Sequence, residues 1–251
     1  WIDIMSKEDE LIAERMRKRE ELLKVGNPYP YSFDQTHHAK ELHDRFGNNP
    51  PQTNIGERVR VAGRLLAMRR MGKMNFAQLS DESGNIQLWF KADVLQEFES
   101  LSLYDIGDFI GVAGVLITTK TGELTVEVHS FQMLAKALHQ LPDKFHGLKD
   151  TESRYRQRYV DLIVNPDVKA VFKKRARIVS AVRNYLDTRG FTEVETPVLQ
   201  PVYGGAAARP FVTMHNELKQ QMYLRISDEL YLKRLLVGGF ERVYEMNKDF
   251  R

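Results

Sequence analysis

The chain has 251 residues, 42% of them hydrophobic and 28% charged, with a formal net charge of +3 at pH 7. This length favours two domains, and the composition is typical of a globular protein with a mild affinity for polyanions. The absence of cysteine excludes disulfides, thiolate metal sites and cysteine nucleophiles. No apolar run approaches the roughly 20 residues of a membrane span, and residues 1–5 do not resemble a signal peptide. We therefore expect a cytoplasmic protein with no membrane partner.

Residues 6–24 predict a charged helix at the periphery of the fold. Ser6 is placed to cap this helix, and Asp9 occupies the capping-box position. Its apolar stripe is narrow, and its basic residues come late in the helix, where they suit the helix dipole. The basic face either touches a nucleic acid or is simply solvated. Residues 26–30 (GNPYP) end the helix, and no sustained period follows up to about residue 55.

From residue 57 onward the sequence alternates between apolar and polar residues, as β-strands do. Five short strands are predicted, at residues 57–65, 73–80, 85–91, 108–118 and 123–134. Residues 94–103, between the third and fourth strands, predict a short helix. Five strands with a helix in this place indicate a small closed barrel of the OB-fold type.

Strand parity predicts which side chains of this barrel face outward. With Ala77, Leu79 and their apolar counterparts inside, the outward residues are Phe76, Gln78, Gln87, Trp89, Glu123, Thr125 and Glu127. Aromatic rings stack on bases and polar groups read base edges, so this face could bind single-stranded nucleic acid. The alternative is that Phe76 and Trp89 pack under a loop or under another domain.

The second half of the chain mixes helices and strands. Residues 141–148 (LPDKFHGL) predict a linker, and residues 168–186 predict a long amphipathic helix that ends before Gly190. An extended segment at 191–201, a small-residue loop at 204–211 and strands at 222–226 and 240–251 complete the pattern. The last of these ends at Arg251, which either grips an anion or is an ordinary solvated arginine.

Several of these strings resemble the lysyl-tRNA synthetase family of class II aminoacyl-tRNA synthetases, from about Ser6 to the end of the chain. Residues 141–148 and 154–162 (RYRQRYVDL) are similar to that family's junction between barrel and catalytic domain. Residues 190–197 (GFTEVETP) with the preceding helix resemble motif 1, the class II dimerisation element. Residues 204–211 (GGAAARPF) resemble a loop of the lysine enzymes, and residues 229–245 with 250–251 resemble the opening of motif 2.

The resemblance implies an α+β protein, in which a five-stranded OB-fold β-barrel precedes the start of a class II mixed antiparallel sheet with helices. The expected parts are an N-terminal helix (1–27), an anticodon-binding domain (28–145) and the first part of a catalytic domain (146–251). The implied activity uses ATP, with Mg²⁺, to convert lysine to lysyl-adenylate with release of pyrophosphate, and then transfers the lysine to tRNA(Lys). The implied assembly is a homodimer through motif 1.

Motif 3 and the carboxylates that hold magnesium in this family are not found in the 251 residues. We therefore expect no metal site within them, and no complete reaction from them alone. One rival interpretation is a non-catalytic fragment that binds tRNA or dimerises. Another is an aspartyl- or asparaginyl-type synthetase, which Glu229 and the loop at 204–211 disfavour.

In the catalytic part, the resemblance assigns roles to three residues. Arg251 would be the motif 2 arginine, a catalytic group that contacts both ATP and lysine by bridging the α-phosphate and the substrate carboxylate. A guanidinium suits this task because it is always charged and binds oxygens in pairs. Glu229 and Gly205 would bind lysine, although an acidic residue after Ser227 also stabilises a helix start without any ligand. Glycine at 205 permits close approach of the backbone.

In the barrel, the resemblance implies that Phe76 stacks on an anticodon base. Arg69, Gln87 and Glu123 would contact base edges or the RNA backbone. The loop at residues 68–72 allows a second register for Arg69, and Trp89 has no role in this scheme.

Overall fold

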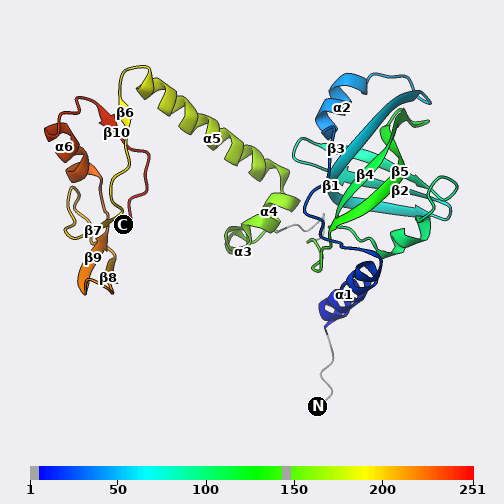
Figure 1. Ribbon diagram of the computed structural model, residues 1–251, viewed down its shortest axis with the longest axis horizontal. Helices are drawn as coiled ribbons and strands as arrows, with labels where there is room; N and C mark the ends of the chain where they lie inside the picture. The colour runs from blue at the N-terminus through cyan, green and yellow to red at the C-terminus, as the bar shows by residue number, and fades with distance from the viewer. Residues whose placement is uncertain (1–5, 143–147) are drawn as a thin grey trace, which may run out of the picture. The chain divides into compact units, whose positions relative to one another are not determined.

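The computed structural model describes residues 6–142 and 148–251, and the chain forms two compact units, Trp1–Arg156 and Gln157–Arg251 (Figure 1). The expected domain boundary after residue 145 and most of the linker predicted at 141–148 lie outside the described residues, as does the start at residues 1–5. Within the described ranges, no helix is long and apolar enough to cross a membrane.

A closed five-stranded barrel forms the first unit. Its strands are β1 (Asn54–Met71), β2 (Met74–Ser80), β3 (Asn85–Lys91), β4 (Phe109–Thr118) and β5 (Leu124–Ala135), in the order β1-β2-β3-β5-β4. β3 and β5 pair in parallel and the other neighbours are antiparallel. The predicted OB-fold barrel is confirmed. The helix expected at 94–103 is a shorter 3-10 helix, η1 (Phe98–Leu103).

Alternate residues of each strand fill the barrel interior, as the parity argument requires. Phe90, at 0% exposure, is among the largest of these buried side chains, and Val61, Leu79, Leu88 and Val126 share the core with it. Thr125 departs from the prediction, because it was expected to be outward and is fully buried. Its hydroxyl donates to Gln87 Oε1 (2.9 Å) and to the Glu123 carbonyl (3.1 Å), so this short side chain lies among its strand neighbours.

Two helices accompany the barrel. α2 (Ala39–Phe46) buries Ala39 and Leu42 and was not predicted, because eight residues are too few to show a helical period. α1 (Lys7–Val25) has the predicted capping box: the Asp9 amide donates to Ser6 Oγ (3.2 Å), and the Ser6 amide donates to Asp9 Oδ2 (3.1 Å).

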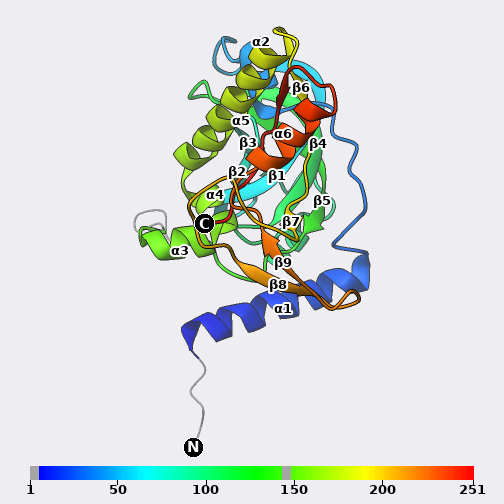
Figure 2. The ribbon, with the colours of Figure 1, turned by 90° about the vertical axis from the view of Figure 1, so that its left-hand side faces the viewer.

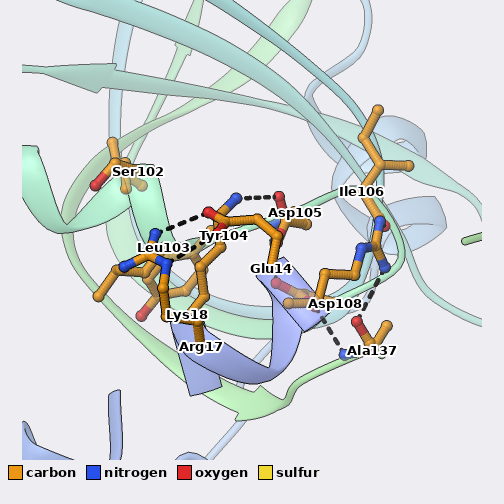
Figure 3. A network of polar contacts seen from close by, with 12 residues as sticks. Glu14, Arg17, Lys18, Ser102, Leu103, Tyr104, Asp105, Ile106, Asp108 and Ala137 are labelled. Atoms are coloured by element: carbon orange, nitrogen blue, oxygen red, sulfur yellow. Dashed lines mark hydrogen bonds and ion pairs between the residues drawn. The ribbon is translucent and has the colours of Figure 1, made fainter. Parts of the chain in front are cut away.

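α1 turns part of its basic face onto the barrel, an arrangement that neither alternative considered for this face had included (Figure 3). Arg15 is 7% exposed and donates to the carbonyls of Ile106, Ala137 and His139, at 2.9–3.0 Å. Lys18 Nζ bonds Asp105 Oδ1 (2.7 Å). The helix therefore docks mainly through polar contacts, which its narrow apolar stripe did not reveal.

Short strands and three helices make up the second unit, which α3 (Thr151–Arg156) precedes. The helices are α4 (Arg158–Val164), α5 (Pro166–Asp187) and α6 (Glu229–Val237). β7 (Leu199–Gln200), β9 (Gln220–Leu224) and β8 (Val212–His215) form an antiparallel sheet, in which β8 and β9 are the orange hairpin of Figure 2. β6 (Thr192–Glu193) and β10 (Val243–Tyr244) form a parallel pair.

The closing segment, residues 240–251, was predicted to be a strand, and this prediction is largely wrong. Only Val243 and Tyr244 pair with a neighbour, the two-residue β6. Further on, the Phe250 amide donates to the Arg225 carbonyl (2.9 Å). The alternation of apolar and charged residues is present, but within the described residues the ladder with β6 covers only two residues.

Candidate functional site

Directly paired residues form a row across the outer face of the barrel. Arg69 of β1 pairs with Phe76 of β2, Phe76 with Trp89 of β3, and Trp89 with Glu127 of β5. A second row, two residues along β2 and β3, pairs Gln78 with Gln87. Since paired residues of a sheet project from the same face, the two rows form a single surface.

This surface contains a pocket of about 230 Å³. Its lining residues are Ala67, Arg69, Phe76, Ala77, Gln78, Gln87 and Glu123. The structure thus brings together all four residues that the sequence proposed for RNA contact. The pocket combines an aromatic ring, a cation, two amides and a carboxylate, which is chemistry suited to a nucleobase.

Two contacts orient the groups of this pocket. Gln87 Oε1 accepts the Thr125 hydroxyl at 2.9 Å, so the amide N–H groups of Gln87 remain the donors it offers. The Phe76 ring is parallel to the Trp89 ring within 4°, with centroids 5.8 Å apart. The outward rings pack on each other, so the alternative that a loop or domain covers them is not needed to explain their burial.

In the second unit, Gly205 lies against the start of α6. A Cβ added at Gly205 would lie 3.0 Å from Glu229 Cβ and 2.9 Å from Ser227 Oγ. Ser227 Oγ accepts the Glu229 amide (3.2 Å), and Asp228 is the N-cap residue of α6. Gly205 and Glu229, predicted to bind the same substrate, are therefore neighbours.

Glu229 and Arg251 both remain open to solvent. The Glu229 carboxylate pairs with Lys233 Nζ at 2.6 Å, with 45% of the side chain exposed. Arg251 Nε donates to the Ile226 carbonyl (3.1 Å), one residue before Ser227, and 59% of its side chain is exposed. The short segment from Arg225 to Glu229 thus contacts or contains all three predicted site residues.

A buried ion pair that the sequence did not indicate supports this segment. Arg225 Nη1 lies 2.6 Å from Glu245 Oε1, and the two side chains are 5% and 4% exposed. Glu245 also accepts the Thr196 hydroxyl (2.6 Å) and amide (3.2 Å). Burial by itself raises the pKa of Glu245, but the Thr196 and Arg225 hydrogen bonds outweigh it and leave the pKa below its usual range.

This ion pair and its Thr196 contacts join the segment around Thr196, the end of β9 and the segment that leads to Arg251. No signal in the sequence could have found it, because Arg225 and Glu245 lie in separate short segments and their pairing depends on tertiary packing.

At 6–142 and 148–251, no three His, Asp or Glu side chains gather where they could hold an ion.

Comparison with protein families finds a match for each of the two parts of the chain. Residues 59–134 match the OB-fold nucleic acid binding domain family. Residues 150–251 match the tRNA synthetases class II (D, K and N). The second unit of the chain is therefore similar to this class II family.

The curated relatives that it resembles are lysine--tRNA ligases. The protein of Carboxydothermus hydrogenoformans is 52% identical over 249 residues, covering 97% of this chain and 49% of the relative. The proteins of Xylella fastidiosa (strain 9a5c) and Clostridium novyi (strain NT) are both 51% identical, with 97% and 96% of this chain covered. The chain spans about half the length of these relatives, 50% and 47% in the latter two.

Proposed function

We propose that this chain is part of a lysine--tRNA ligase, which activates lysine with ATP and transfers it to tRNA(Lys). The observation that carries the proposal is the meeting of Gly205, Glu229 and Arg251 at the segment from Arg225 to Glu229. Glu229 lies beside Gly205, and Arg251 donates to the carbonyl of Ile226 in the same segment, so this segment brings together an anionic and a cationic side chain. That arrangement suits lysine, whose ammonium and carboxylate need opposite partners.

In this proposal, Glu229, Gly205 and Arg251 have different tasks. Glu229 exchanges its present partner, the Lys233 ammonium, for the ammonium of the substrate. Gly205 leaves the space beside Glu229 free of a side chain. Arg251 holds the lysine carboxylate against the ATP α-phosphate, which offsets the repulsion between two anions as the carboxylate attacks and pyrophosphate leaves.

We propose that the barrel binds the anticodon of the tRNA. A base stacks on Phe76 within the pocket, while Gln87, Glu123 and Arg69 contact its edge or the adjacent backbone. A stacked base contributes about 1–3 kcal/mol. Mg²⁺ would accompany ATP as a substrate complex, held by residues other than those described.

We also propose a homodimer through α5. Val171, Ile178, Val182 and Tyr185 recur at helical spacing on this helix and are 40–65% exposed. An apolar stripe of this kind is expected to be covered in the assembled protein. We also place the enzyme in the cytoplasm, because its proposed substrates, tRNA and ATP, are found in that compartment.

Amino-acid-dependent exchange of pyrophosphate into ATP tests the proposal. The enzyme to use is a protein of the relatives' full length that carries this sequence. We expect exchange with lysine and none with aspartate or asparagine. Exchange with aspartate or asparagine in place of lysine would refute the assignment of Glu229.

A further inference from the structure

Trp89 has no role in the proposed RNA contact, yet it is the direct neighbour of Phe76, on which the base is proposed to stack. Trp89 and Phe76 are paired across β2 and β3, and their rings are parallel within 4°. Phe76 lines the pocket, whereas Trp89 is not among its lining residues in the described chain. The Phe76 ring is therefore backed by an indole and contributes to the pocket wall.

The Trp89 ring is itself supported by a charged pair. Lys91 Nζ lies 4.6 Å from the centroid of the Trp89 ring, a distance typical of a cation–π contact. Glu127 Oε2 holds the same ammonium at 2.7 Å, and the two side chains are 20% and 22% exposed. Glu127 is also the strand partner of Trp89. Lys91 and Phe76 thus contact the same indole.

Trp89 is held by packing and not by a hydrogen bond. Its indole N–H is buried and has no acceptor among the described residues. Replacing the indole with a phenyl ring therefore removes no hydrogen bond and keeps an aromatic surface for Phe76. This makes Trp89→Phe a conservative variant for testing a role in stacking.

We propose that Trp89 is a positioning residue for RNA binding. It holds the Phe76 ring in a fixed orientation, so that an unpaired base stacks on a ring that is already ordered. Fixing a side chain before binding improves affinity, because the complex no longer has to order it. This inference rests on the proposed anticodon contact at Phe76.

Binding of an RNA stem-loop with the lysine anticodon to the 251-residue chain tests the inference. The variants are Trp89→Leu, Trp89→Phe, Phe76→Ala and the double variant Trp89→Leu/Phe76→Ala, with urea unfolding to verify that each is folded. Loss of one aromatic pair corresponds to a weakening of about 2- to 12-fold for Trp89→Leu. We expect Trp89→Phe to bind within about twofold of the wild type. The double variant should bind no more weakly than Phe76→Ala.

The outcomes distinguish a failure of this inference from a failure of the proposed anticodon contact at Phe76. If Phe76→Ala weakens binding and Trp89→Leu does not, the positioning role is wrong and the anticodon contact stands. If neither variant changes binding, the anticodon contact at Phe76 is wrong and the inference fails with it. Additive losses in the double variant would show that Trp89 contacts RNA itself, which also overturns the proposal. If Trp89→Leu does not fold, Trp89→Met replaces it in the same comparisons.

Discussion

Gly205 lies so close to Glu229 that a Cβ added at Gly205 would lie 3.0 Å from the Glu229 Cβ, which is closer than ordinary van der Waals contact. Gly205 also has φ +86°, a conformation that side-chain-bearing residues rarely adopt. Both the contact and the backbone conformation therefore require glycine. The small-residue loop and the first turn of α6 form one structural element, which we propose binds lysine.

Gly205→Ala should impair lysine binding as well as stability. The φ alone costs about 1–2 kcal/mol for alanine, and the added methyl displaces Ser227 or Glu229. We expect KM for lysine in pyrophosphate exchange to rise by about tenfold, which is the effect of about 1.4 kcal/mol.

Gly239→Ala is the matched control for this prediction. Gly239 has φ +103°, and a Cβ there would meet nothing within 4 Å. This variant should lose similar stability and keep its KM for lysine. An equal rise of KM in both variants would show that the effect comes from backbone strain and not from contact with the lysine site.

The buried Arg225–Glu245 pair should make the second unit sensitive to acid. Because the pKa of Glu245 is lowered in the folded state, the pair stabilises fully above the unfolded pKa of about 4.3. That contribution is lost as the pH falls from there through the lower, folded pKa. Glu245→Gln should destabilise by about 3–5 kcal/mol at pH 7 and flatten this acid dependence, as measured by urea unfolding.

An exposed pair in the same unit provides the comparison. Arg183 and Glu193 lie 2.9 Å apart, with 43% and 37% of their side chains exposed. Glu193→Gln should cost at most about 1 kcal/mol at neutral pH. Similar losses for the two variants would contradict the importance given to burial.

The polar docking of α1 predicts that the helix can be released without disturbing RNA binding. Arg15→Met removes three hydrogen bonds to carbonyls of the barrel unit, and Lys18→Met removes the ion pair with Asp105. Hydrogen exchange of the α1 amides should accelerate at least tenfold in the double variant, the effect of losing about 1.4 kcal/mol. RNA affinity should stay within about twofold. Loss of RNA binding together with the helix would show that α1 belongs to the RNA site.

How far the sequence predicted this structure depended on the range of the interactions. The barrel was predictable because its alternation of buried and outward residues is local and repeated over five strands. The same parity identified Phe76 and Gln87, which the structure places in one pocket, although their role in RNA binding stays a prediction. Arg225 and Glu245 could not be paired, because no local pattern connects them. The strand expected before Arg251 failed for a similar reason, since alternation alone does not supply a partner strand.

The apolar stripe of α5 predicts a dimer that a single charge should disrupt. Ile178 is 57% exposed on this stripe, so Ile178→Glu would place a carboxylate in the proposed interface. Sedimentation should show the wild type as a dimer and this variant as a monomer. Ser180→Glu adds the same charge two residues away, on the opposite side of the helix, and should leave the dimer intact. A monomeric wild type would refute the interface.

Two variants of the full-length protein test directly whether the barrel binds RNA and the second unit activates lysine independently of each other. Phe76→Ala should raise KM for tRNA(Lys) by about 5- to 150-fold, corresponding to about 1–3 kcal/mol of stacking, and leave lysine-dependent pyrophosphate exchange unchanged. Glu229→Gln should abolish most of that exchange and leave RNA affinity unchanged. If either variant impairs both properties equally, the barrel and the lysine site are not the separate elements described above.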